Sequence, residues 1–168
     1  MNNNLIITIG REYGTGGREI GQKLALRLGV PFYDRELITR AAKKTGFDEK
    51  LFEQLDKRAT NSFLYSLTMF GSVGLNGMSL TDQLYLAQSN IIREMAEDSS
   101  CVIVGRCAAH VLRDFPNKFD FFIHGSIEDR VKRVQTCGDY VIEGKTPEAA
   151  LEKMDKQRST YYNYYTGK

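Results

Sequence analysis

The sequence has few of the features that mark an exported or membrane-bound protein. It contains three cysteines in 168 residues, Cys101, Cys107 and Cys137. Their odd number and wide spacing argue against a disulfide framework and favour a reducing compartment. No hydrophobic run approaches the roughly 20 residues that span a bilayer. The first residues, Met1-Asn-Asn-Asn4, contain neither a basic flank nor an apolar signal core. We therefore expect a cytoplasmic protein that does not bind membranes.

The sequence also lacks an excess of charge of either sign. Its 23 Lys and Arg residues nearly balance 21 Asp and Glu residues, which leaves a net charge of +2. This balance gives no overall attraction to nucleic acid, so any binding of anions has to come from the local placement of arginines. Repeats, low-complexity segments and linkers are missing too, and 42% hydrophobic residues suffice to bury one core. The sequence predicts a single domain over residues 1–168 that binds no nucleic acid.

Segments typical of strands alternate with segments typical of helices. Short hydrophobic runs predict strands at residues 5–9, 31–33, 101–104 and 119–123, and helical spacing predicts helices at residues 18–28, 34–44, 81–97, 127–134 and 146–161. Such alternation favours an α/β fold of three layers, in which helices cover both faces of a parallel sheet. A further helix is expected from Asp48. The weaker pattern between Thr60 and Ser79 predicts an apolar, glycine-containing insertion, with a lid or an oligomer contact as its candidate roles.

The first predicted strand runs into glycines and then continues at helical spacing, in the segment Leu5-Ile-Ile-Thr-Ile-Gly-Arg-Glu-Tyr-Gly-Thr-Gly-Gly-Arg-Glu-Ile-Gly21. Glycines let backbone N–H groups approach an anion closely, and the start of a helix favours negative charge. The segment therefore predicts a phosphate-binding loop. The usual pattern of such a loop, G-x-x-x-x-G-K-[ST], adds a lysine for the outer phosphates and a hydroxyl for magnesium. Here Gly17 and Arg18 follow Gly16 instead.

Arginines recur after the predicted strands, at the edge where ligands of open parallel sheets bind. They stand at positions 11, 18, 35, 40 and 106, and again in the last two helices at 130, 133 and 158. The planar fork of arginine pairs with phosphate oxygens, and the transition state of phosphoryl transfer spreads charge over several oxygens. The pattern therefore favours phosphoryl transfer. Ordinary alternatives remain: Asp34 suits a helix cap without any ligand, and Arg130 and Arg133 suit surface pairs with Glu128 and Asp129.

A dinucleotide-binding oxidoreductase is a second interpretation of the glycine turn. Gly14-x-Gly16 follows a strand and opens a helix, and Asp34 lies about 20 residues further on, where an acid that binds ribose is expected. Against this interpretation, Glu19 stands where the third glycine belongs. Hydride transfer also gives no reason for Arg40 and Arg106.

Taken in order, these motifs resemble those of the cytidylate kinase-like family of P-loop nucleoside monophosphate kinases, and the resemblance covers nearly the whole chain. Gly14-Thr-Gly-Gly-Arg18 is similar to the family's phosphate loop, Asp34-Arg-Glu-Leu-Ile-Thr-Arg40 to its Asp-x5-Arg segment and Gly105-Arg106 to its Gly-Arg-Asp turn. Asp129-Arg-Val-Lys-Arg133 resembles the entry to its lid, and Asp155-Lys-Gln-Arg158 resembles its basic return helix.

The resemblance implies a three-layer P-loop fold and transfer of the ATP γ-phosphate, with Mg²⁺, to a nucleoside monophosphate or a similar small phosphorylated acceptor. It implies that ATP is bound by Gly14, Thr15, Gly16, Gly17, Arg18 and Glu19. It places the acceptor at Asp34, Arg40 and Arg106, in a region of about residues 34–80. It also implies a lid over about residues 127–160, so that the candidate catalytic residues are Arg18, Arg130, Arg133 and Arg158.

Three departures from the family's pattern bear on these expectations. Gly17 takes the lysine position, so we expect Arg18, or else Arg11, to supply the cation, and Thr15 or a carboxylate to hold the metal. Cys107 replaces an aspartate that helps to read the cytosine ring, which leaves the acceptor base open. The chain stops at Lys168, before the last strand and helix that complete the sheet in relatives, so either the protein is short or the sequence is a fragment. If the last strand is missing, an open sheet edge favours pairing with another chain.

These departures also keep a second function open, a nucleotide-binding sensor or scaffold without catalytic activity. The spacing of the cysteines does not suit zinc, and we predict no metal site built from them. The tyrosines from Tyr161 to Tyr165 predict an apolar face that packs on the domain or on a second subunit, with base stacking as the alternative.

Overall fold

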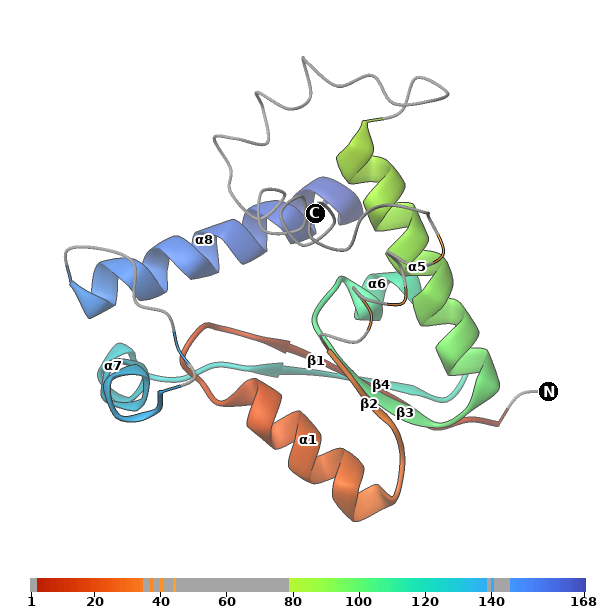
Figure 1. The fold of residues 1–168 in the computed structure, drawn as a ribbon, viewed down its shortest axis with the longest axis horizontal. Coiled ribbons are helices and arrows are strands. Elements are labelled where there is room, and N and C mark those ends of the chain that lie inside the picture. Colours follow the sequence, from red (N-terminus) through yellow and green to blue (C-terminus); the bar gives the residue numbers. More distant parts are fainter. Residues whose placement is uncertain are drawn as a thin grey trace.

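The computed structural model describes residues 3–34, 79–138 and 146–168, together with Leu37, Arg40, Lys44 and Tyr140. Its four strands run parallel in the order β2-β3-β1-β4. They are β1 (Ile6–Arg11), β2 (Phe32–Tyr33), β3 (Cys101–Val104) and β4 (Lys118–Ile123). The helices are α1 (Gly17–Leu28), α5 (Leu80–Asp98), α6 (Ala108–Val111), α7 (Ile127–Thr136) and α8 (Pro147–Thr166). Helix α1 covers one face of the sheet and α5 and α6 cover the other, which confirms the predicted three-layer α/β fold (Figure 1).

Alternate side chains of the central strands fill two separate cores. On one face, Ile7 and Ile9 of β1 pack with Ala25 of α1 and with Val102 and Val104 of β3. On the other face, Ile6, Cys101 and Ile103 pack with the apolar stripe of α5, which includes Ile91, Ile92 and Met95. A parallel strand covered on both faces reads as an uninterrupted hydrophobic run. This is why the strand at Cys101 to Val104 could be predicted from the sequence.

The helices begin and end at residues suited to those positions. Ser79, Ser126 and Thr146 cap α5, α7 and α8, and each side-chain oxygen accepts a backbone N–H of the first turn. Pro147 follows its cap in the first turn of α8, where its missing N–H costs nothing. Helix α1 ends at Gly29 in the left-handed conformation. Helix α8 begins after Thr146, where the sequence predicted a helix from residue 146, whereas α5 begins at Leu80, before the predicted start at residue 81.

Some predictions differ from the structure and others fall outside the part that it describes. Helix α6 was not predicted, because four residues are too few to show a helical period. Strand β1 runs on to Arg11, so Arg11 belongs to the strand and not to the loop. In the predicted acceptor region of residues 34–80, the structure describes Asp34, Leu37, Arg40, Lys44, Ser79 and Leu80, and the helix expected from Asp48 and the insertion lie outside the described residues.

Strand β4 lies at one edge of the described sheet and is poorly covered. Phe119, Phe121 and Phe122 are all exposed. Phe122 packs over Gly10 of β1, where a Cβ would lie 2.9 Å from its ring. Proteins usually cover an apolar edge of this kind. Among the described residues, no helix combines the length and hydrophobicity needed to cross a membrane.

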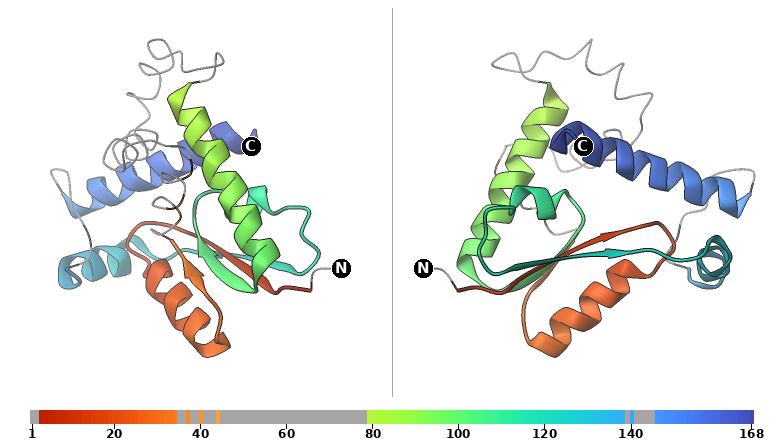
Figure 2. Two further views of the ribbon diagram at one scale, coloured as in Figure 1. Left: turned by 45° about the vertical axis from the view of Figure 1, so that its right-hand side comes forward. Right: turned by 180° about the vertical axis from the view of Figure 1, so that it is seen from behind.

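The end of α8 is attached to α5 by tyrosines. The ring of Tyr165 stacks on that of Tyr85, with centroids 3.8 Å apart, and the Tyr165 hydroxyl donates to the carbonyl oxygen of Thr81 at 3.2 Å. Tyr161 is also buried, with its ring against that of Tyr85. The tyrosine cluster therefore packs on the domain itself. Helix α8 runs from this contact back toward α7, at the carboxyl end of the strands (Figure 2).

Candidate functional site

The loop between β1 and α1 lies at the carboxyl edge of the sheet and depends on its glycines. Gly14 and Gly16 have φ angles of 83° and 74°, in the left-handed region that side chains disfavour. A Cβ at Gly14 would lie 3.0 Å from both Leu151 and Val134. Helices α7 and α8 therefore pack directly on the loop, and glycine is required there by conformation and by space.

The backbone N–H groups of Gly14 to Glu19 have no hydrogen-bond acceptor among the described residues. Helical hydrogen bonding resumes only where Ile20 N donates to Gly16 O at 2.9 Å. Free N–H groups at a helix start, at the positive end of the helix dipole, form an anion-binding site. The loop predicted to bind phosphate therefore has its donors available.

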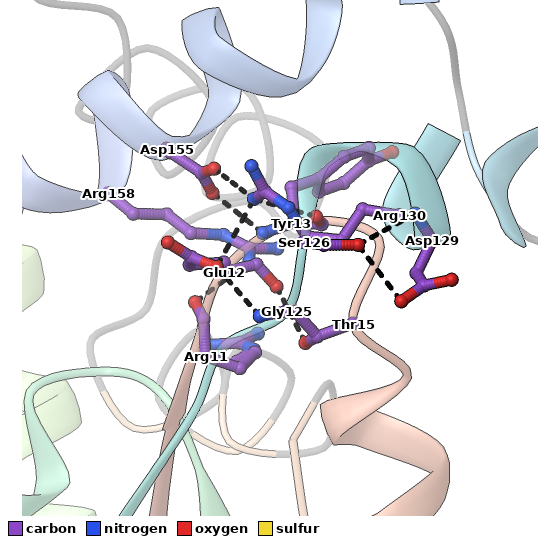
Figure 3. Close-up of polar contacts among 10 residues, drawn as sticks. All are labelled: Arg11, Glu12, Tyr13, Thr15, Gly125, Ser126, Asp129, Arg130, Asp155 and Arg158. Carbon is purple, nitrogen blue, oxygen red and sulfur yellow. Dashed lines mark hydrogen bonds and ion pairs between the residues drawn. The ribbon is translucent and has the colours of Figure 1, made fainter. Parts of the chain in front are cut away.

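Hydrogen bonds from neighbouring elements hold this loop in place (Figure 3). The backbone N–H of Tyr13 donates to Asp155 Oδ1 of α8 at 2.6 Å. The Thr15 hydroxyl donates to the carbonyl oxygen of Glu12 at 2.9 Å, and the Glu12 side chain accepts the N–H of Gly125 at 3.1 Å. The loop is thus fixed from within, from the end of β4 and from α8.

Arg130 on α7 is part of the same network. It is 8% exposed, and its Nη1 donates to Asp155 Oδ2 at 2.5 Å and to the carbonyl oxygen of Tyr13 at 3.3 Å. Glu12 Oε2 lies 3.5 Å from the same nitrogen. Arg130 is thus buried between the loop and α8, in place of the considered surface pair with Glu128 or Asp129. Asp129 instead accepts the hydroxyl of the cap Ser126 at 2.9 Å.

Arg133, one turn further along α7, lies over the loop. Its guanidinium carbon is 2.6 Å from the point where a Cβ of Gly16 would be, and it pairs with Glu19 in the first turn of α1. A hydrogen bond with Tyr140 raises the pKa of Arg133. The Nε atoms of Arg130 and Arg133 are both buried without a hydrogen-bond partner in the described part of the chain.

Further arginines meet beside the loop at the ends of β1 and β3. Arg158 of α8 donates to the carbonyl oxygen of Arg11 at 3.1 Å, and its guanidinium lies 5.1 Å from the centroid of the Tyr13 ring. Burial, then the charge of Arg158, and less strongly those of Arg106 and Arg18, lower the pKa of Arg11 to about 10. These arginines therefore act on one another as neighbouring like charges.

Asp34 is the acidic member of this cluster. Its Oδ2 lies 3.0 Å from Nε of Arg18, and its charge opposes the lowering of the Arg11 pKa. Arg40 is exposed, with its guanidinium 5.5 Å from the centroid of the Tyr33 ring at the end of β2. Of the predicted acceptor residues, Asp34 and Arg106 thus lie in the cluster, and Arg40 has its guanidinium near the end of β2.

The turn after β3 that carries Arg106 has an unusual backbone. Gly105, Arg106 and Cys107 have φ angles of 82°, 57° and 55°. Non-glycine residues in this region store strain that is typical of functional sites. Cys107 is buried, and burial raises the pKa of its thiol to about 12, so the thiol stays protonated.

Sequence reasoning gave less weight to three residues of this site. Arg11 was named only as an alternative to Arg18, although its position between a hydrophobic strand and the glycines indicates a residue of the site. Glu12 and Asp155 were not singled out as ligands of the buried Arg130. The described residues contain no group of three or more His, Cys, Asp or Glu side chains placed to hold a metal.

Comparisons with known proteins agree with this fold. The profile of the cytidylate kinase-like family matches residues 6–168. A comparison with curated proteins finds no match. The chain is 30% identical to an uncharacterized protein from Eubacterium ventriosum ATCC 27560, over 98% of this chain and 80% of that one, with a TM-score of 0.64. It is 16% identical to shikimate kinase from Acinetobacter baumannii in complex with shikimate, over 97% and 80%, with a TM-score of 0.48. Because the family profile spans nearly its whole length, the chain belongs to the cytidylate kinase-like family.

Proposed function

We propose that this protein binds ATP at the loop from Gly14 to Glu19 and transfers the γ-phosphate to a nucleoside monophosphate or a similar small phosphorylated acceptor. The observation that carries the proposal is the set of N–H groups in this loop that have no acceptor among the described residues, with an arginine cluster beside it. Phosphoryl transfer asks a protein mainly for positioning and for stabilisation of negative charge. Membership of a kinase-like family supports the same reaction.

The residues divide between the two substrates. The loop amides would bind the donor phosphates, Arg18 would reach them from the first turn of α1, and Arg133 would cover them from α7. Arg106, in the turn after β3, and Arg40, whose guanidinium lies near the Tyr33 ring at the end of β2, would bind the acceptor phosphate together with Asp34. In this proposal Arg130 is a positioning residue, because its contacts with Asp155 and Tyr13 hold the loop and α8 together.

A magnesium ion that arrives with ATP takes most of its ligands from phosphates and water and needs only one or two carboxylates. Glu19 and Asp34 are two of the carboxylates near the loop, and each is paired with an arginine. The carboxylate chemistry therefore fits a nucleotide-bound Mg²⁺, which would neutralise charge on the transferred group. Binding of the metal would compete with these two ion pairs.

The remaining expectations belong to the same proposal. Three free cysteines suit a reducing compartment, and we propose the cytoplasm. Because the phenylalanines of β4 are exposed, we also propose that the protein forms a homo-oligomer. The family makes CMP the first acceptor to test, although Cys107 leaves the base open.

A nucleotide sensor without catalytic activity is the second candidate, favoured by the glycine at position 17. Loss of one electrostatic donor commonly lowers turnover by about 10²-fold or more. A protein that kept the loop and lost this cation would bind ATP without transferring phosphate. The two candidates therefore differ in turnover and agree in binding.

The test is a titration of the purified protein with ATP·Mg²⁺ and with NAD, followed by transfer assays to CMP, UMP and AMP. ATP binding with transfer supports the kinase, and ATP binding without transfer favours the sensor. Binding of NAD in the absence of ATP binding would overturn both in favour of an oxidoreductase. Arg113→Ala is a suitable control for variants of the arginine cluster, because it removes an exposed arginine that pairs with Asp114 in the segment before β4.

A further inference from the structure

The space that a side chain at position 17 would occupy is filled by Arg11. A Cβ at Gly17 would lie 2.7 Å from Cβ and 3.0 Å from Cγ of Arg11. Position 17 directly follows Gly16, and there the usual phosphate loop has its lysine. Arg11 and a lysine at 17 therefore exclude each other. The glycine at position 17 is a steric requirement of the arginine at position 11.

From this point the Arg11 side chain reaches toward the end of β3. Its Nη1 fills the space in which a Cβ of Gly105 would lie. The side chain thus extends from the donor loop at Gly17 to the turn that carries Arg106. In the proposed function, a phosphoryl group in transfer from donor to acceptor passes between these two segments.

The guanidinium of Arg11 makes no hydrogen bond and no ion pair with any described residue. Burial and the nearby charges of Arg158, Arg106 and Arg18 lower its pKa to about 10, which leaves it charged at neutral pH. The one acidic neighbour, Asp34, only partly offsets these charges. A largely buried cation without an ion-pair partner among the described residues is unfavourable until an anion joins it. The N–H donors of Arg11 are therefore available to phosphate oxygens.

Arg18 is less suited to the same role. Its guanidinium is paired with Asp34 at 3.0 Å, and 55% of its side chain is exposed. Water screens a charge in that position, and a bond to phosphate would have to replace the bond to Asp34. Arg11 has neither disadvantage.

We propose that Arg11 replaces the absent lysine of the phosphate loop and contacts the transferred phosphoryl group from the end of β1. This assignment rests on the proposed function, since it concerns the same site. In the step, an acceptor phosphate oxygen bonds to the γ-phosphorus while the bond from that phosphorus to the bridging oxygen breaks. ADP leaves with the electron pair. Arg11 donates hydrogen bonds to the oxygens and gives up no proton.

If the cation has moved from position 17 to position 11, mutation can move it back. Gly17 does not have a left-handed φ, so a lysine fits its backbone once Arg11 is removed. In Arg11→Ala we expect turnover, or ATP affinity if the protein is a sensor, to fall by about 10²-fold. The double variant with Arg11→Ala and Gly17→Lys should recover at least about tenfold of that loss. The matched double variant with Gly17→Gln fills the same space without charge and should recover none.

A further variant tests the contact without removing the charge. Gly17→Ala has to displace Arg11, so it should weaken the wild-type protein and have no further effect in Arg11→Ala. Melting curves identify any variant that fails to fold, and Gly17→Ala then carries the test on its own. Failure of the wild-type protein to bind ATP would refute the proposed function and this assignment together. Normal ATP binding and turnover by folded Arg11→Ala, or by Gly17→Ala, would refute the assignment alone.

Discussion

Arg130 of α7 donates to Asp155 of α8 at 2.5 Å, and the other oxygen of Asp155 accepts the backbone N–H of Tyr13 at 2.6 Å. One carboxylate therefore joins α7, α8 and the phosphate loop. Both side chains of the pair are largely buried, at 9% and 25% exposed. Removal of one partner from a buried pair leaves the other charge uncompensated.

Replacement of Asp155 by alanine should lower the free energy of unfolding by about 3 kcal/mol, at the low end for a broken buried pair because Glu12 stays 3.5 Å from Arg130. Urea unfolding at neutral pH measures the change. Asp114→Ala is the control, since Asp114 is 85% exposed in its pair with Arg113, and surface pairs contribute about 1 kcal/mol or less. Equal free energies of unfolding for the two variants would show that the Asp155 pair contributes no more to stability than a surface pair.

A comparison of Gly16→Ala with Gly29→Ala separates the effect of a glycine's backbone conformation from the effect of the side chains around it. Both residues have positive φ, so each variant should lose about 1 to 2 kcal/mol of stability. A Cβ at Gly16 meets the guanidinium of Arg133, whereas a Cβ at Gly29 meets nothing within 4 Å. We therefore expect weaker ATP binding only in Gly16→Ala. Calorimetric titration of both variants is the measurement, and similar affinities would argue against ATP at this loop.

The sequence was sufficient to predict the layers of the fold and the loop, but not the partners of the arginines. Strand β3 could be predicted because burial of both faces produces a hydrophobic run, and α8 because Thr146 and Pro147 mark its start. The contact of Arg11 with position 17 depends on the conformation of the loop between them, and that of Arg130 with Asp155 depends on how two helices pack on each other. Local sequence patterns do not predict such contacts. For this reason the spacing of Arg130 suggested a surface pair, whereas the residue is buried.

The three cysteines should differ in their reaction with iodoacetamide. Burial raises the pKa of Cys101 to about 11 and that of Cys107 to about 12, so at pH 8 at most about one molecule in a thousand carries a reactive thiolate at either site. Cys137 is partly exposed. Mass spectrometry at pH 8 should find label on Cys137 first, and label on Cys101 and Cys107 only after denaturation. Early labelling of Cys107 would mean that the turn after β3 opens readily.

The pH dependence of stability should reveal the ion pairs of Glu19. A hydrogen bond from Lys23, then the charges of Lys23 and Arg133, lower the pKa of Glu19 in the folded protein. Because the folded pKa is lower than the unfolded one, this group stabilises the fold above its unfolded pKa, and the contribution disappears as the pH falls through the lowered folded value.

Glu19→Gln should therefore be less stable than the wild type at pH 7, by a small amount because Glu19 is exposed, and the difference should vanish in acid. The measurement is the free energy of unfolding in urea between pH 7 and pH 2. Glu148→Gln is the matched control, because Glu148 stands in the first turn of α8 as Glu19 does in α1. Equal pH profiles for the two variants would assign the effect to the helix dipole. A larger change for Glu19→Gln assigns it to Lys23 and Arg133, and hence to the contact that holds Arg133 over the phosphate loop.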